Sequence, residues 1–369
     1  MNAADVCANL AYMTSPTQPA HVDSSSAVTP HATTSPARRG WGSRIAPVLL
    51  LLVIAPLVAE FLLGDVTLAS LPALVLFIPL YGGGALLIRE VVRRRGGGWP
   101  AIVVFAAAFG VTEEGLATQS LFNPDYAHQH LLSSGFLPAL GIAIPWTVYV
   151  LSLHVIWSIC TPIALVECMF PRRRTESWLR TPGLIIVGAV YVIGVVAAFA
   201  TTWVVYRYVA SPSRLIGAAV VAVVLIVAGV LLTRVRRPER SGLEASRPAP
   251  AAWVVVGAAA VAASLVVITP HLPGAVWRTL TILVIELVGL ITITLWSRRL
   301  GWGDRQILAL AAGALFAYAW HAFVSPPAFD SASIVIVQIS NVVFAALVVA
   351  AVWFAARRIA AAQGSRLTP

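Results

Sequence analysis

The chain has 369 residues, of which 59% are hydrophobic and 11% are charged, and its mean hydropathy is +0.86. Soluble globular domains carry about 25% charged residues, so this composition excludes an ordinary water-soluble protein and indicates that lipid is part of the solvent. Every basic residue is an arginine and the net charge is +10, but the arginines lie in short clusters between apolar segments, which indicates membrane topology and not nucleic-acid binding.

Residues 1–44 precede the first apolar segment and are rich in Ser, Thr, Pro and Ala without hydrophobic periodicity. This composition is typical of a disordered segment. It lacks the charged start and the apolar stretch of a signal peptide, so the first apolar segment is expected to direct its own insertion. We therefore predict a disordered cytoplasmic tail over residues 1–44, a transmembrane helical domain over 45–358 and a cytoplasmic C-terminal tail over 359–369.

The transmembrane domain is divided into apolar segments of a length that suits a bilayer. A helix rises about 1.5 Å per residue, so a hydrocarbon core of about 30 Å requires roughly 20 apolar residues. The predicted fold class is therefore all-α: a polytopic transmembrane helix bundle of about ten spans. These spans cover residues 45–63, 66–88, 100–121, 142–169, 182–206, 214–233, 251–270, 277–297, 306–324 and 333–356.

The arginines give the direction of these spans. If the N-terminus is cytoplasmic, 22 of the 25 arginines fall in cytoplasmic segments, and the exceptions are Arg207, Arg214 and Arg278. Cytoplasmic loops of membrane proteins carry an excess of Lys and Arg, so the alternation predicts that both termini are cytoplasmic. The Arg-only, Ala- and Val-rich composition fits a bacterium with a GC-rich genome, and the expected location is the bacterial inner membrane.

Several spans carry ionisable or amide side chains, which are costly in lipid and require an explanation. Placed by depth, they fall between the midplane and the outer boundary of the bilayer and come from six helices. This common level predicts a polar cavity in the outer half of the membrane. The residues are Glu60, Glu113, Glu114, His154, Glu286, His321, Gln338 and Asn341.

Other polar and small residues have simpler interpretations. Glu90 and Glu167 lie beside arginines at cytoplasmic span ends, where ion pairing is expected. Gly82–Gly84 and Gly110 predict close helix packing. His128 and His130 form an HxH pair near Asp125 in an outer loop, and we interpret this loop as solvated.

Glu113 and Glu114 are the strongest candidates for chemistry, because adjacent carboxylates in a low dielectric cannot both be ionised cheaply. Adjacent helical positions point about 100° apart, so the sequence does not decide which of the two faces the cavity. A Glu-Glu pair in one span followed by His154 in the next resembles the CAAX-protease and bacteriocin-processing (CPBP) membrane endopeptidases, whose motifs are EExxxR, FxxxH and HxxxN or HxxxD.

The resemblance is partial. Thr118 stands where the first motif has Arg, Val150 replaces Phe in the second, and His321 is followed by Ser325 in the third. In the CPBP family a Glu activates water while His and Asn assist and stabilise the oxyanion. The resemblance thus implies the candidate catalytic residues Glu113, Glu114, His154, His321 and Asn341. The segments EEGLATQSLFNPDY and LHVIWS…PIALVE also look like a group of uncharacterised bacterial membrane proteins, for which no activity is implied.

Three functions remain open from the sequence. The first is a CPBP-like, glutamate-dependent hydrolase, metal-independent or metal-assisted, acting on a membrane-embedded peptide or small molecule. The second is a proton- or solute-coupled transporter that uses the same groups as a relay. The third is a structural or partner-binding membrane protein whose polar residues join helices. No cofactor and no metal ligand are assigned; a zinc site from Glu114, His154 and His321 is weighed, but no span offers an HExxH pair.

Overall fold

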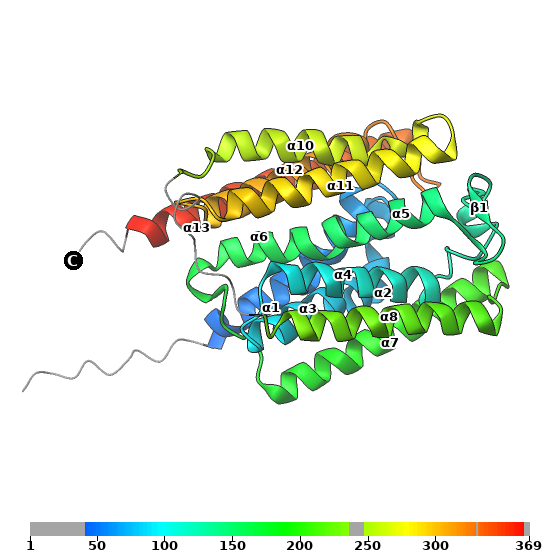
Figure 1. The fold of residues 1–369 in the computed structure, drawn as a ribbon, viewed down its shortest axis with the longest axis horizontal. Coiled ribbons are helices and arrows are strands. Elements are labelled where there is room, and N and C mark those ends of the chain that lie inside the picture. Colours follow the sequence, from blue (N-terminus) through cyan, green and yellow to red (C-terminus); the bar gives the residue numbers. More distant parts are fainter. Residues whose placement is uncertain (1–40, 236–246, 330, 365–369) are drawn as a thin grey trace, which may run out of the picture. The chain divides into compact units, whose positions relative to one another are not determined.

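A computed structural model describes residues 41–235, 247–329 and 331–364, and these segments are almost entirely helical (Figure 1). The α labels denote α-helices and the η labels denote 3₁₀- and π-helices. The first four helical passes are α1 (Trp41–Pro56) with η1 (Leu57–Leu62); η2 (Leu68–Ala73), α2 (Leu74–Phe77), η3 (Ile78–Gly82) and α3 (Gly83–Arg94); α4 (Trp99–Thr112) with η4 (Glu113–Ala117); and α5 (Ile144–Leu153), η6 (His154–Cys160) and α6 (Thr161–Met169).

Six further helices follow: α7 (Thr181–Tyr206), α8 (Pro212–Leu232), α10 (Ala252–Val267), α11 (Ala275–Ser297), α12 (Asp304–His321) and α13 (Ile334–Gly364). Short 3₁₀ turns in the loops are η5 (Tyr126–His128), η7 (Pro171–Arg173) and η8 (Thr269–His271). The loop after η4 contains the two-residue strands β1 (Phe136–Leu137) and β2 (Ile142–Ala143), which pair antiparallel. The all-α fold class is confirmed.

Each of the ten predicted spans coincides with one helical pass. Eight of them are long and apolar enough to cross a membrane, whereas α10 is a shorter apolar helix and α12 has a lower hydropathy. The ends differ from the prediction: α1 begins at Trp41, and α13 continues to Gly364. The continuation of α13 follows from its sequence, since the Ala-rich run after Arg358 favours helix even where the chain has left the apolar core.

Contacts at the helix ends bring the arginine-bearing ends of several helices together. At the arginine-rich end, Arg358 donates to the Met169 carbonyl at 3.2 Å, and Arg174 pairs with Asp304. At the other end, the Tyr208 hydroxyl donates to the Phe122 carbonyl at 2.7 Å. The grouping of arginines inferred from the sequence is therefore present at these helix ends, while the assignment of one end to the cytoplasm remains a prediction.

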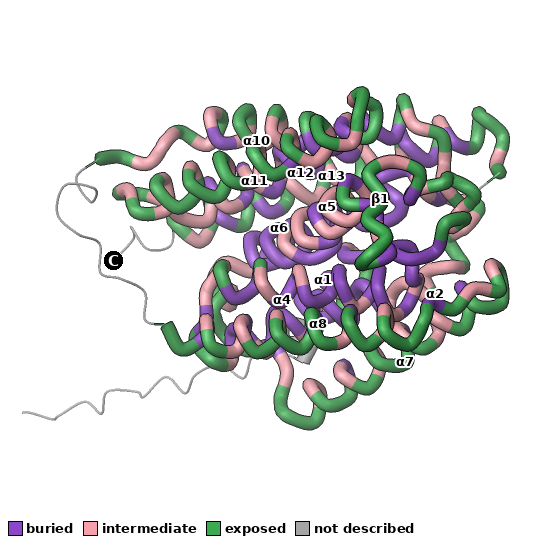
Figure 2. The backbone as a smooth tube through the Cα atoms, turned by 45° about the vertical axis from the view of Figure 1, so that its right-hand side comes forward, coloured by how far each residue is buried: buried purple, intermediate pink, exposed green. Residues whose placement is uncertain are grey.

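The pass α5–η6–α6 runs between two groups of helices (Figure 1). One apolar cluster joins α6 to α10, α12 and α13, and another joins η6 and α6 to α1, α3, α4 and α7. Buried residues concentrate on these inner helices, and α7, α8 and α11 are largely exposed (Figure 2). Only 17% of the apolar window is buried in α7 and in α8, and 6% in α11, so these three helices present apolar surface to the surroundings, as lipid-facing helices do.

A buried ion-pair cluster fastens α3 to α6 at the arginine-rich end. Arg93 forms a two-point contact with Glu167, at 2.8 Å through Nε and 2.7 Å through Nη2. Arg89 pairs with Glu167 at 3.1 Å and with Glu90 at 2.5 Å, and its guanidinium lies 3.5 Å from the Trp178 ring. The expected pairing of Glu90 and Glu167 with arginines is confirmed.

Candidate functional site

The described residues include four π-helical segments, and each contributes at least one polar side chain to the same buried cluster. Glu60 lies in η1, Tyr81 in η3, Glu113 and Glu114 at the start of η4, and His154 at the start of η6. A π turn holds an extra residue per hydrogen-bonded ring and occurs most often at functional sites. The local distortion of four neighbouring helices therefore coincides with the polar centre predicted for the outer half of the bundle.

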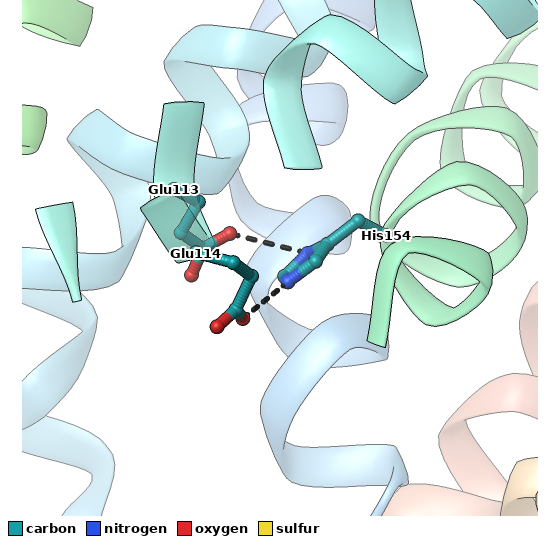
Figure 3. Close-up of side chains that lie close together, drawn as sticks. All are labelled: Glu113, Glu114 and His154. Carbon is teal, nitrogen blue, oxygen red and sulfur yellow. Dashed lines mark hydrogen bonds and ion pairs between the residues drawn. The ribbon is translucent and has the colours of Figure 1, made fainter. Parts of the chain in front are cut away.

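The imidazole of His154 joins the two adjacent glutamates (Figure 3). Its Nε2 atom lies 2.7 Å from Glu114 Oε1, and its Nδ1 atom lies 3.1 Å from Glu113 Oε2. The Nδ1 atom is also 3.1 Å from Ser158 Oγ, one turn along η6. The exposed fractions of Glu113, Glu114 and His154 are 2%, 7% and 5%, so bulk water is excluded from these contacts.

Each carboxylate is also held from outside by a hydroxyl donor. Tyr81 donates to Glu113 Oε1. Thr118 donates to Glu114 Oε2 at 3.2 Å, and Ser120 donates to the same oxygen. Each glutamate thus uses one oxygen for an outer donor and presents the other to His154.

The Glu113 Oε2 atom is the exception to this satisfied network. It is buried and has no hydrogen-bond partner among the described residues, because its approach to Nδ1 brings the charges close without hydrogen-bond alignment. A buried acceptor without a donor is costly and needs a functional or chemical explanation. Glu113 Oε2 is therefore an open acceptor at the centre of the site.

A third carboxyl group belongs to the same cluster. Glu60 is 8% exposed, and the Tyr81 hydroxyl interacts with it as well as with Glu113. Three buried carboxyl groups are therefore linked, Glu60 to Glu113 through the Tyr81 hydroxyl and Glu113 to Glu114 through the His154 imidazole. Because charges in a low dielectric interact strongly and lose their hydration, the cluster requires protons or a cation to balance it.

Aromatic rings pack against the His154 imidazole and line the site. The Tyr81 ring lies over the His154 imidazole, with centroids 6.2 Å apart and planes at 18°, and Phe109 meets the imidazole edge-on at 5.7 Å. Gly110 allows α4 to approach η6, since a Cβ at this position would lie 3.1 Å from the His154 Cβ. The expected close packing at this glycine is confirmed.

His321 and Asn341 belong to a different group of contacts. His321 Nε2 lies 3.0 Å from Ser325 Oγ, and Asn341 donates to the Ala322 carbonyl at 2.7 Å. In the described chain, no hydrogen bond or ion pair links either residue to Glu113, Glu114 or His154. The single polar centre expected from residue depth is thus divided, and the catalytic role of all five candidates remains a prediction.

The separation has a structural cause in η6. His154 points from η6 toward η4, whereas Trp157 points toward α12, where it stacks on Tyr318 at 4.3 Å and donates to the Ala314 carbonyl at 2.8 Å. His321 lies at the end of α12, beyond this aromatic pair. Glu286 is separate as well, because its interaction is with Ser152 of α5.

The histidines of the loop after η4 are exposed, as the solvated-loop interpretation expects. His128 Nδ1 lies 3.1 Å from Asp125 Oδ2, and His130 Nδ1 lies 3.9 Å from Asp125 Oδ1. The three side chains are 58–79% exposed.

Sequence reasoning missed Tyr81 and Ser120. The available signal for Tyr81 was a phenolic hydroxyl inside an apolar span, directly before Gly82–Gly84. Ser120 lies at the end of the predicted span 100–121, where a serine offered no such signal. The sequence also assigned no metal ligand, whereas ligand atoms of Glu113, Glu114 and His154 lie within 4.8 Å of one another.

Comparison with known proteins gives a family and no activity. A search of curated proteins and a search of solved structures each found no match. A family model matches residues 49–366, from the first helix to beyond the last one. The helices and the buried site both lie within these residues, and the chain belongs to the family described as "Uncharacterized membrane protein family".

Proposed function

We propose that this chain is a membrane-embedded hydrolase of CPBP type that cleaves a membrane-embedded peptide. The proposal is carried by one observation: a buried glutamate with an open acceptor oxygen stands beside an imidazole that a second glutamate holds in place. A general base must lie within hydrogen-bond reach of the proton that it abstracts, and Glu113 Oε2 offers that reach to a water molecule.

The hydrolysis balances with groups of this site. A glutamate takes a proton from water as the water oxygen bonds to the peptide carbonyl carbon. The C–N bond then breaks, and the proton passes to the leaving nitrogen. Glu114 orients His154 through the 2.7 Å contact, and Tyr81 orients Glu113.

The departures from the CPBP motifs are accommodated by this chain's own contacts. Thr118, in the place of the motif arginine, donates to Glu114. The Tyr81 hydroxyl donates to Glu113, so it supports the base, a task that His321 and Asn341 do not share because they form a separate group of contacts.

The test compares the membrane proteomes of cells that express the wild type, Glu113→Gln or Glu114→Gln. Loss of the base should lower the abundance of product N-termini by at least about 100-fold, since general base catalysis contributes about 10²–10⁴-fold. Glu176→Gln is the matched control, because Glu176 is 51% exposed in a loop. Equal expression and equal thermal midpoints in detergent show that the variants fold.

Identical membrane proteomes in all four strains would refute the hydrolase. The transporter is the second candidate, because Glu60, Tyr81, Glu113, His154 and Glu114 form a continuous chain of proton-carrying groups. A proton flux into proteoliposomes that His154→Ala abolishes would select it. Lower stability of the variants without any change in proteome or flux would select the structural role.

A further inference from the structure

The buried site contains more acidic than basic groups. Glu60, Glu113 and Glu114 are each at most 8% exposed. Among the described residues, the ion pairs of Glu113 and Glu114 are both with the one His154 imidazole, and Glu60 has no ion pair. A buried charge is retained only where a partner or a metal ion compensates it. The excess of carboxylates is thus the first indication of a missing cation.

The second indication is the way in which the donor atoms are divided. The outer oxygens of Glu113 and Glu114 accept from Tyr81, Thr118 and Ser120, while the inner oxygens turn to the two ring nitrogens of His154. His154 Nδ1 also has Ser158 Oγ at 3.1 Å, so the imidazole is oriented from outside as well. Metal ligands are oriented in this manner by outer hydrogen bonds.

The third indication is the open acceptor. Glu113 Oε2 belongs to a side chain that is 2% exposed, is aimed into the cluster, and has no hydrogen-bond partner in the described chain. The Tyr81 hydroxyl donates to the other oxygen of Glu113, so it does not supply the hydrogen bond that Oε2 lacks.

We propose that one carboxylate oxygen each of Glu113 and Glu114 and one ring nitrogen of His154 bind one divalent ion of the first transition series. One ligand atom from each residue lies within 4.8 Å of the others. Ligands at about 2.0–2.2 Å from zinc stand about 3.3 Å apart in a tetrahedral site. An ion on Nε2 would therefore widen the 2.7 Å contact with Glu114 Oε1 and draw Glu113 Oε2 away from Nδ1, which now lies 3.1 Å from it.

The donor set selects the class of ion. Imidazole with carboxylates suits Zn²⁺, Fe²⁺, Mn²⁺ or Co²⁺, whereas Ca²⁺ takes six to eight oxygen ligands. Three protein ligands leave one position open, as in catalytic zinc sites. Use of the ion in catalysis, where it would polarise water or a carbonyl group, rests on the proposed hydrolase function; binding of the ion does not.

The experiment uses the full chain, purified in detergent, stripped with EDTA and titrated with Co²⁺ alone. Tetrahedral Co²⁺ with nitrogen and oxygen ligands has intense visible absorption bands, which report the site without any activity assay. We expect one equivalent of Co²⁺ per chain to produce these bands and one equivalent of Zn²⁺ to remove them. The bound ion should also raise the thermal midpoint of unfolding.

Variants separate this site from other histidines. Glu113→Gln and His154→Gln should abolish the bands, and Tyr81→Phe should weaken Co²⁺ binding by about 10–100-fold because it removes an outer donor. The control is His128→Ala with His130→Ala, which removes the exposed loop pair and should change nothing. Tyr81→Phe keeps the ring against His154, so it tests the site even if the ligand variants fail to fold.

Absence of bands in the wild type, or bands that persist in His154→Gln and are unaltered in Tyr81→Phe, would overturn the metal site. Binding as expected together with unchanged membrane proteomes would keep the metal site and refute the hydrolase. Proteolysis that is fully active after EDTA, with no bound ion, would keep the hydrolase and refute the metal site.

Discussion

Glu113 and Glu114 both face the site, although neighbouring helical positions diverge by about 100°. Two features make this possible. The helix widens into η4 at these residues, and the flat imidazole of His154 stands between them and offers a nitrogen to each. The sequence identifies the pair as unusual but leaves open which of the two residues faces the site. The structure shows that both do.

Gly110 sets the distance between the glutamates and His154. Replacement of Gly110 by Val should lower the free energy of unfolding by about 1–3 kcal/mol, the usual cost of overpacking, because Cβ would meet the His154 Cβ and Leu151 Cδ2 at 3.1 Å. The measurement is equilibrium unfolding in mixed detergent micelles.

Gly188→Val in α7 is the control for Gly110→Val. A Cβ at Gly188 meets nothing within 4 Å, and the change in intrinsic helix propensity is the same at both positions. Equal effects of the two substitutions would show that the contact with His154 is not tight.

At the scale of elements, the apolar pattern predicted where helices lie but not how they are distorted. The spans that contain Glu60, Glu113 and His154 were located by their apolar residues, yet the π turns at these residues had no signal in the pattern. A π turn gives up regular hydrogen bonds, so it persists where tertiary contacts compensate for them. In this protein the compensation is the shared polar network of η1, η3, η4 and η6.

The buried ion pairs between α3 and α6 give a prediction at the scale of elements. Glu167→Gln should destabilise the protein by about 3–5 kcal/mol, because it leaves the buried guanidinium groups of Arg89 and Arg93 without their shared partner. Thermal or denaturant unfolding in detergent measures the change.

Glu176→Gln removes an exposed pair with Arg173 at 3.5 Å and should cost about 0–1 kcal/mol. A loss for Glu167→Gln no larger than this would show that the buried cluster contributes little to stability.

At the scale of the whole molecule, helix direction and arginine placement agree. The arginine-bearing loops meet at one end of the bundle, and the loops at the other end hold the few exceptions, among them Arg207 over Trp203 at 5.7 Å. Which end is cytoplasmic follows from the positive-inside rule and can be measured directly.

Cysteine labelling tests this orientation. With Cys7, Cys160 and Cys168 changed to Ser, Ser133→Cys in the loop before α5 should react with an impermeant maleimide in intact cells. Ser177→Cys, in the loop before α7, should react only after the membrane is permeabilised. Both serines are exposed, so the reverse pattern would invert the topology.

The sequence by itself determined the membrane class, the all-helical fold, the positions of the ten passes and the candidates Glu113, Glu114 and His154. Each of these follows from the cost of placing polar or charged groups in lipid, which acts locally along the chain. Only the tertiary structure decided that Tyr81 joins the site, and that of the residues predicted for the polar cavity Glu60 belongs to it while His321 and Asn341 do not. Depth in the bilayer is fixed by position along a helix, whereas the neighbour that a side chain meets depends on helix rotation and packing, and neither is encoded in hydropathy.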